Sequence, residues 1–482
     1  MFTLLDKAAN RTCQGASRRE FLRVGALGLA GLSLPHLLAA RAAASATGQP
    51  WVTDKSVVLL FLQGGPPHIE CFDPKMSAPS EFRAMFGEVK TNLPGVTFGS
   101  HFGKMAKLAD KLAIVRSYGS KNANHSYENV TTAGNPLKAS ISSIYARVAG
   151  TNDPTTGIPN NVLVLPEAVK EKIKIGTSFE TTALPTLTQP GHLGPNFAAF
   201  NPAGGSTIKQ NMDLRIEPDR FMDRKHLLAG LDRIRKGAEE SGELDAVDKY
   251  QQQAFEIIAK GVGDAFDWSK EDPRTIARYD TSKLFNIDDV HRWGDMRRSS
   301  HYLGHQLLMA RRLCESGCGF VTVSDCGWDF HSNNNSPKNL GGMNWLAPQV
   351  DHAVAAFIED IHARGLQDKI LLCITGEMGR NPRINSNGGR DHYGDLTSLV
   401  FAGGGLKMGQ TIGQSDRQNR APATTPYNAS NLLSTRNFGE FEFWFSSIKV
   451  AAIIAFMSPR FIDSVRTLSK IILSRSSFSF PP

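Results

Sequence analysis

Six short apolar runs constrain the fold of this chain more than any other feature. Each is rich in Val, Ile, Leu or Phe and is bounded by Gly, Pro, Asn or other polar residues, and they occupy residues 57–62, 112–115, 162–165, 320–323, 370–374 and 399–402. Such runs, without alternation of apolar and polar residues, are typical of strands buried on both faces of a parallel sheet. We therefore expect these segments to be strands of a sheet.

Segments between the runs have the spacing of amphipathic helices. Val350, Val354, Phe357 and Ile361 repeat every three or four residues, which places their side chains on one face of a helix. Leucines at 303–313 have a similar pattern, and Gly317 is a suitable C-terminal stop. Strands that alternate with helices predict an α/β fold with a doubly wound, mostly parallel sheet.

Two segments in the middle of the chain differ from this pattern. Residues 184–205 are rich in Pro, Gly, Thr and Asn, which predicts a long excursion over the sheet and not a linker. Polar helices are expected at residues 220–236 and 244–260. The length of 482 residues, 41% of them hydrophobic, allows one large domain or two closely packed lobes.

Potential ligand side chains follow the first two runs. In an open α/β sheet, ligands bind beyond the carboxyl ends of the strands. His68, Glu70 and Asp73 follow the first run, after two glycines that permit a close backbone turn. His125 and Ser126 follow the second run and lead into an expected helix. A hydroxyl at this position would face the helix N-terminus, where an anion is favoured.

The fourth and fifth runs are also followed by such residues. Asp329 and His331 are two apart, so an extended backbone aims both side chains the same way. The next ones along the chain are Glu377, Arg380, Arg390, Asp391 and His392. Carboxylates with imidazoles suit Zn, Mn or Mg, and the two arginines suit a phosphate or sulfate oxygen beside a metal.

Ordinary structural roles are open for each of these residues taken alone. Glu377 can be an ion-pair partner of Arg380, His392 a surface loop histidine, and Ser126 a helix cap. Their recurrence after several strands favours a shared site.

Paired arginines near the N-terminus predict export. The sequence Ser-Arg-Arg-Glu-Phe-Leu at residues 17–22 precedes an apolar run at 24–40 and a stretch of small residues. This is the layout of a twin-arginine signal with a cleavage site, and not of a stable membrane span. We expect a signal peptide at residues 1–46 and a periplasmic or secreted mature protein. An ordinary secretory signal or a retained anchor is the alternative.

The charge distribution argues against a nucleic-acid partner. The formal net charge is +8, but residues 1–46 and 436–482 hold most of the excess Lys and Arg. The body between them is close to neutral and has no basic stripe interleaved with aromatic residues. Residues 436–482 are also unusually rich in Phe, Ile, Ser and Arg, and we interpret them as an atypical tail produced by an altered reading frame.

These motifs resemble those of a bacterial family, domain of unknown function 1501 (DUF1501), whose members are twin-arginine-exported and similar to sulfatases of the alkaline phosphatase superfamily. The resemblance covers residues 55–434. It rests on residues 68–75, 124–126, 191–194, 310–313, 328–333, 375–380 and 389–392.

The resemblance implies a divalent metal site at the strand ends and a nucleophile after the second strand. Ser126 matches the nucleophile position. The positions that match metal ligands are Asp329, His331, Glu377 and His392, with His68, Glu70, Asp73 and Asp391 as second choices. No Cys-x-Pro-x-Arg sequence is present, and Glu377-Met378 stands where the superfamily has an Asp-His pair. We therefore expect no formylglycine, and one metal ion in place of two.

The expected activity is hydrolysis of a phosphate or sulfate ester on a small molecule or glycan. Zn, Mn or Mg would activate Ser126, next to His125, or a water. Arg380 or Arg390 would stabilise negative charge on the transferred group. The alternative is a non-catalytic exported protein of the same fold that binds an anionic glycan or a protein partner.

Overall fold

The computed structural model describes residues 55–170, 179–203, 262–285, 300–333 and 336–433, and also Arg220 and Asp223. The predicted signal peptide, the atypical tail and, apart from those two residues, the predicted polar helices lie outside the described residues. The chain divides into two units, and the sheet and the site belong to the unit made of Asp54–Gly134 and Lys138–Ala429.

A seven-stranded sheet forms the core of this unit, in the order β11-β4-β10-β7-β1-β6-β5. Its strands are β1 (Ser56–Leu62), β4 (Leu112–Val115), β5 (Asn161–Val164), β6 (Phe320–Asp325), β7 (Ile370–Thr375), β10 (Leu399–Gly403) and β11 (Gln410–Ile412). All six predicted strands are present, and their side chains are buried as the apolar runs indicated. The prediction of an α/β fold with a mostly parallel sheet is confirmed.

β10 is the exception to the parallel arrangement. It is antiparallel to both β7 and β4, whereas β1 is parallel to both β6 and β7. The run at 399–402 therefore forms a strand, but not a parallel one. A strand buried on both faces has the same apolar composition in either direction, so its composition could not reveal the orientation.

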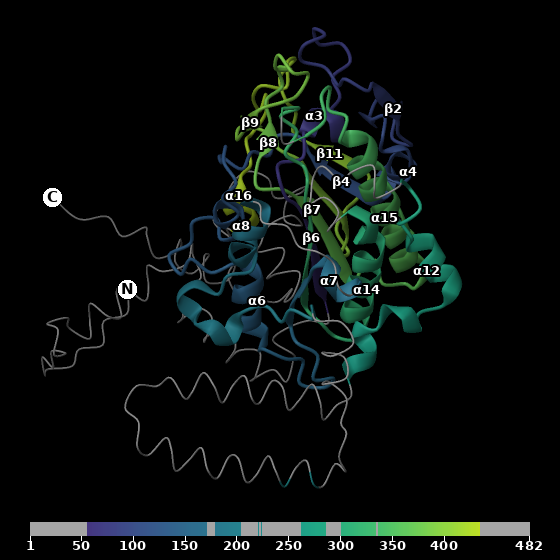
Figure 1. The fold of residues 1–482 in the computed structure, drawn as a ribbon, viewed down its shortest axis with the longest axis vertical. Coiled ribbons are helices and arrows are strands. Elements are labelled where there is room, and N and C mark those ends of the chain that lie inside the picture. The colour runs from purple at the N-terminus through teal and green to yellow at the C-terminus, as the bar shows by residue number, and fades with distance from the viewer. Residues whose placement is uncertain are drawn as a thin grey trace, which may run out of the picture. The chain divides into compact units, whose positions relative to one another are not determined.

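Two long helices cover one face of the sheet (Figure 1). α14 (Leu303–Glu315) and α15 (Met343–Ala363) bury residues such as Leu307 and Phe357 in a common core with the strands. The helical spacing in both segments is thus confirmed. Gly317 ends α14 as expected, because its φ of 106° favours glycine and its N–H donates to the Cys314 carbonyl at 3.2 Å.

Shorter helices cover the opposite face. Phe61 of β1 and Leu163 of β5 pack there with residues of α5 (Glu128–Thr131) and α8 (Phe179–Leu187). In Figure 1, α6 (Ile141–Ala149) and α8 lie across the sheet from α14 and α15. The segment predicted as an excursion runs beside β5, because Phe200 forms backbone hydrogen bonds with both Asn161 and Leu163.

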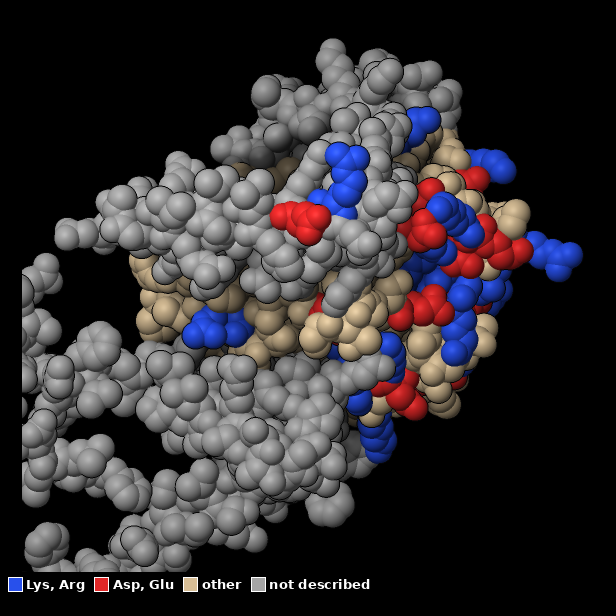
Figure 2. All heavy atoms as spheres, turned by 90° about the horizontal axis from the view of Figure 1, so that it is seen from below, with Lys and Arg blue, Asp and Glu red and all other residues tan. Residues whose placement is uncertain are grey.

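The remaining elements of the described residues are short. They are α3 (His68–Cys71), β2 (Glu88–Lys90), β3 (Thr97–Gly99), α4 (Gly103–Ala106), α7 (Pro166–Val169), α12 (Pro273–Tyr279), β8 (Gly379–Arg380), β9 (His392–Tyr393), α16 (Ala429–Leu433) and the 3₁₀ turns Ala109–Lys111, Gly191–Leu193, Pro195–Phe197, Val262–Phe266, Trp268–Lys270 and Ser300–Tyr302. Among the described helices, none combines the length and the apolar character that crossing a bilayer requires. Figure 2 shows Lys and Arg side chains interspersed with Asp and Glu over the described part of one face.

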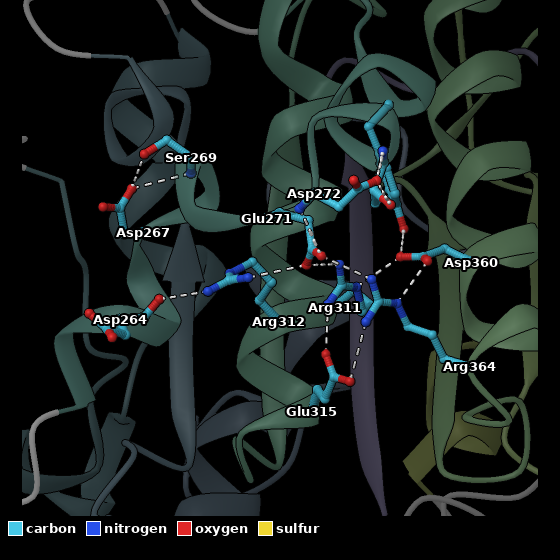
Figure 3. Close-up of polar contacts among 12 residues, drawn as sticks. Asp264, Asp267, Ser269, Glu271, Asp272, Arg311, Arg312, Glu315, Asp360 and Arg364 are labelled. Carbon is cyan, nitrogen blue, oxygen red and sulfur yellow. Dashed lines mark hydrogen bonds and ion pairs between the residues drawn. The ribbon is translucent and has the colours of Figure 1, made fainter.

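A buried ion network joins α14 and α15 to the segment that precedes α12 (Figure 3). The guanidinium of Arg311 is fully buried and donates to Asp360 Oδ2 at 2.8 Å, to Glu315 Oε2 at 2.6 Å and to Glu271 Oε2. Arg364 donates to Asp360 Oδ1 at 2.9 Å and to Glu271 Oε1 at 3.0 Å. These bonds tie three separate segments of the chain together.

Arg312 completes this arginine network. Its Nη1 donates to Glu271 Oε2 at 3.1 Å and its Nη2 to the Asp264 carbonyl at 2.8 Å. Three arginines thus face the three carboxylates of Glu271, Glu315 and Asp360, so the network is balanced in charge (Figure 3). Arg311 and Arg312, which belong to the segment 310–313 of the family resemblance, therefore stabilise the fold.

Candidate metal site at the strand ends

The potential ligands meet beyond one edge of the sheet. β4, β6 and β7 run in the same direction, so the loops that follow them emerge side by side. These loops carry His125, Asp329 and Glu377, and the β8–β9 hairpin brings in His392. Figure 1 shows β8 and β9 beyond that end of the sheet.

Imidazole nitrogens converge on a single carboxylate oxygen. Asp329 Oδ1 lies 3.2 Å from His392 Nε2, 3.2 Å from His331 Nε2 and 3.6 Å from His125 Nε2. The ligand atoms of His125, Asp329 and His392 all lie within 4.8 Å of one another. We call His125, Asp329, His331, Glu377 and His392 the strand-end cluster.

Glu377 contacts the side of the His125 ring that faces away from Asp329. Its side chain is fully buried, and its Oε1 accepts the Gly64 N–H at 2.8 Å and contacts His125 Nδ1 at 3.0 Å. A carboxylate accepts, so His125 Nδ1 donates this hydrogen bond. Within the described residues, Glu377 Oε2 has no hydrogen-bond partner.

His392 also carries a hydrogen on Nδ1, and a backbone carbonyl accepts it. Its Nδ1 lies 3.1 Å from the Ala123 carbonyl, which can only accept, so Nδ1 carries the hydrogen. In this orientation the Nε2 atoms of His125 and His392 both face Asp329 Oδ1. These three atoms are grouped as ligands of one metal ion would be, with Arg380 as a further partner of Asp329.

The residues fit a divalent metal ion by three observations. Two imidazoles and a carboxylate are a donor set that zinc and similar ions prefer. Two ligand atoms about 2.1 Å from a tetrahedral ion lie about 3.4 Å apart, and the two Nε2 atoms lie 3.2 and 3.6 Å from Asp329 Oδ1. The third pair of ligand atoms is also close, because the ligand atoms of His125, Asp329 and His392 all lie within 4.8 Å of one another.

His331 is held between two carboxylates. Its Nε2 contacts Asp329, and its Nδ1 lies 2.8 Å from Oδ1 of the exposed Asp391. The hydrogen bond to Asp329 raises the pKa of His331, against the effect of burial, and Asp391 adds to the rise. Burial alone would raise the pKa of Asp329, but hydrogen bonds from His331, His392 and Arg380 hold it well below its usual range.

Arg380 and Arg390 occupy buried structural positions. Arg380 donates to Asp329 Oδ1 and to the carbonyls of Gly64 and Gly65. Arg390 pairs with Glu70 at 2.7 Å and also bonds neighbouring carbonyls. Neither guanidinium has any exposed surface, so the expectation that they contact a substrate oxygen does not match their placement. Arg380 instead fixes Asp329.

His68 lies in a separate buried group. Its Nε2 lies 3.3 Å from the Asn419 carbonyl, and burial lowers its pKa to about 4. Glu70 is occupied by Arg390 and by the Met85 N–H. Asp73 accepts from Ser415 and pairs with Arg116 at 3.5 Å. The structure therefore does not bring these second-choice residues together with the strand-end cluster.

Ser126 directly follows His125 in the half-buried turn before α5. Its N–H donates to Asn124 Oδ1 at 3.0 Å, and its carbonyl accepts from Asn122 Nδ2 at 2.9 Å. α5 is a single turn that begins at Glu128. A helix this short offers few free amides, so the expected anion site at its N-terminus has little support.

Two further residues shape the site: Gly64, where the sequence predicted only a close backbone turn, and Asn122, to which no role was assigned. Gly64 has a φ of 111°, and a Cβ there would lie 2.5 Å from the Asp329 nitrogen. The close approach of this backbone lets its amide reach Glu377. Asn122 is buried beneath the turn of His125 and Ser126. The run of asparagines at 122 and 124 was the sequence signal for such a turn, because Asn side chains often bond to the backbone two residues on.

Comparisons with known proteins give the following matches. A family model described as "Protein of unknown function (DUF1501)" matches residues 54–438. No curated protein matches the chain. Among solved structures, the PsFucS1 sulfatase from Pseudoalteromonas sp. matches with 12% identity and a TM-score of 0.30, over 80% of this chain and 69% of that one. Ps i-CgsB in complex with k-i-k-neocarrahexaose matches with 10% identity and a TM-score of 0.29, over 79% and 70%.

Proposed function

Because the chain belongs to the DUF1501 family, whose description assigns no activity, we propose a function from its own residues: an exported, metal-dependent hydrolase of phosphate or sulfate esters. The observation that carries this proposal is the convergence of His125 and His392 on Asp329. Such a concentration of potential ligand atoms at the carboxyl edge of a sheet is typical of a catalytic metal site.

His125, Asp329 and His392 would hold the ion. A bound Zn, Mn or Mg ion supplies Lewis-acid polarisation of an ester oxygen and lowers the pKa of a bound hydroxyl or water. Glu377 orients His125 through the hydrogen bond to Nδ1, and buried Arg380 orients Asp329. Partners of this kind fix the direction and tautomer of metal ligands.

Ser126 is the proposed nucleophile. It is adjacent to His125 in the chain and half-buried, and two asparagine side chains hold its backbone. Its Oγ would form a bond to the phosphorus or sulfur of the ester while the bond to the alcohol oxygen breaks. Water would then release the transferred group from Ser126.

Export is proposed from the leader sequence alone. The paired arginines at residues 18 and 19 and the apolar run that follows support a twin-arginine signal. This route carries folded proteins, which is compatible with a metal site assembled before export.

The test is an ester screen on the protein supplied with Zn, Mn or Mg. We expect turnover of a phosphate or sulfate ester, lost by on the order of 10³-fold in Ser126→Ala. His392→Ala should lose the bound metal, measured by elemental mass spectrometry. A Ser142→Ala variant is the matched control, because Ser142 is a buried serine in α6, and it should keep both metal and turnover.

Three outcomes would count against all or part of this proposal. Absence of bound metal from the folded wild type would remove its basis. Bound metal without turnover of any ester, in wild type and Ser126→Ala alike, would favour the non-catalytic binding protein. Turnover that survives in Ser126→Ala would assign the attack to water.

A further inference from the structure

Asn122 links two of the loops that carry the strand-end cluster. It is 3% exposed, and its Nδ2 donates to the Ser126 carbonyl at 2.9 Å and to the Glu377 carbonyl at 3.2 Å. Its Oδ1 accepts the Asn124 N–H at 3.2 Å. Both donors of this amide are therefore used to connect the loop after β4 with the loop after β7.

A third loop packs against the same residue. The carbonyl of Gly394, two residues after His392, accepts the Lys121 N–H at 2.8 Å. A Cβ on Gly394 would lie 2.8 Å from the nitrogen of Asn122, so the two backbones are in close contact. The turn at 122–126 thus lies between the loops of Glu377 and His392.

This turn determines how both imidazoles are presented. It contains His125, whose Nδ1 donates to Glu377, and the Ala123 carbonyl, which receives the Nδ1 hydrogen of His392. A displacement of the turn would therefore break both Nδ1 hydrogen bonds and change the direction in which each Nε2 faces. Neither hydrogen bond requires Asn122 directly, but both depend on where it holds the turn.

We propose that Asn122 is a positioning residue of the metal site. Its buried amide holds the turn at residues 122–126 in place, and this turn directs the Nε2 atoms of His125 and His392 toward Asp329. The benefit of this role to the protein rests on the proposed metal-dependent function, but the orientation of the two rings can be measured without any metal. Asn122 touches neither the ion nor a substrate.

The experiment compares three full-length variants with the wild type. Asn122→Asp keeps the side-chain shape but removes both N–H donors and places a carboxylate against two carbonyl oxygens. Asn122→Ser retains one hydroxyl donor and avoids that repulsion, so it covers the case in which the aspartate variant fails to fold. Asn160→Asp is the matched control, because Asn160 is 4% exposed and its Nδ2 donates to the Gly150 carbonyl at 3.2 Å.

The first measurement is affinity for Zn by competition with a chelator. Asn122→Asp should bind about 10–100-fold more weakly, the usual cost of losing a partner that orients metal ligands. Asn122→Ser should fall between it and the wild type, and Asn160→Asp should match the wild type. The proposal is overturned by wild-type affinity in folded Asn122→Asp or Asn122→Ser, or by an equal loss in Asn160→Asp.

The second measurement is ring-nitrogen NMR of His125 and His392 in the metal-free protein. The wild type and Asn160→Asp should show both rings with hydrogen on Nδ1, and the Asn122 variants should show mixed tautomers. If the wild type binds no metal but the rings respond in this way, the hydrolase proposal fails and the positioning role stands. Unchanged rings in the Asn122 variants overturn the positioning role itself.

Discussion

The strand-end cluster and the arginine network are both built from buried charged groups, but they differ in how those charges are balanced. In the network, guanidinium nitrogens contact both oxygens of Glu271 and both oxygens of Asp360. In the cluster, Arg380 pairs with Asp329 and interacts electrostatically with Glu377, whose Oε2 has no hydrogen-bond partner within the described residues. Within the described residues, every carboxylate oxygen of the network has a guanidinium partner, although Arg312 Nε has no hydrogen-bond partner, whereas one carboxylate oxygen of the cluster has no hydrogen-bond partner.

This difference separates a structural role from a functional one. A buried network whose carboxylates are all paired contributes to the specificity of the fold, while a buried carboxylate oxygen without a partner calls for an explanation such as a bound ion. Both regions have strongly shifted pKa values, with that of Asp329 and that of Glu271 lowered. Shifted pKa values alone would therefore not have distinguished the two.

The Arg311→Met variant tests the difference between the two regions most directly. Removing one partner of a buried ion pair leaves its carboxylates uncompensated and typically costs about 3–5 kcal/mol. We expect the free energy of unfolding, measured by urea denaturation, to fall by this amount, and the metal content to stay at the wild-type level. Loss of metal without loss of stability would reverse the roles that we assign to the two regions.

The control for this variant is Glu315→Gln in the same network. The Glu315 side chain is 41% exposed, in contrast to the fully buried Arg311. Exposed ion pairs contribute about 0–1 kcal/mol, so the change in unfolding free energy should stay below about 1 kcal/mol. An equal effect in both variants would show that burial does not control the cost.

A second prediction concerns the binding of a metal ion to the strand-end cluster. An ion that binds only the folded protein should raise the free energy of unfolding by about 2.7 kcal/mol at 100 times its dissociation constant. Urea denaturation with and without Zn, Mn or Mg should show this gain in the wild type and in Arg311→Met. His392→Ala should show none, and a gain that persists in it would place the ion elsewhere.

The smallest expected effect is the pH dependence of Glu271. Burial raises its pKa, but hydrogen bonds and charge from Arg311, with Arg364, lower it from 4.5 to about 2. Because the folded pKa is depressed, the stabilisation is present above about pH 4.5 and is lost as pH falls toward 2. The residue is partly solvated, so we expect a loss of up to about 1 kcal/mol.

Urea denaturation of wild type and Glu271→Gln from pH 5 to pH 2 measures this contribution. The two curves should differ most at pH 5 and converge toward pH 2. A difference that stays constant over this interval would mean that the charge of Glu271 does not contribute to the stability of the network.

Sequence reasoning located the strands because burial on both faces leaves a direct trace in composition. It placed Asp329, Glu377 and His392 after strands, and parallel strands bring such residues to one edge. It could not find the inward turn of Arg380 onto Gly64 and Gly65, or the pairing of Arg390 with Glu70. These contacts join residues more than 300 positions apart, and no local pattern records them.

The rotation of His125 toward Asp329 was missed for a related reason. The sequence indicated only that His125 precedes a serine at a turn, which favoured a role beside the nucleophile. Its direction is set by Glu377 and by the turn that Asn122 holds, and both relations depend on loops from separate strands. Residue types after a strand predict which groups can meet, and tertiary contacts decide which of them do.

The central position of β1 has a consequence for synthesis. Its two neighbours are β6 and β7, whose residues pair Val57 with Phe320 and with Leu371. Of the strands in the described residues, β1 is synthesised first, and both of its neighbouring strands are in place only after residue 375 has emerged from the ribosome. Non-local pairing of this kind slows folding and exposes a nascent chain to aggregation. Chaperone demand during translation should accordingly be highest before β7 is complete.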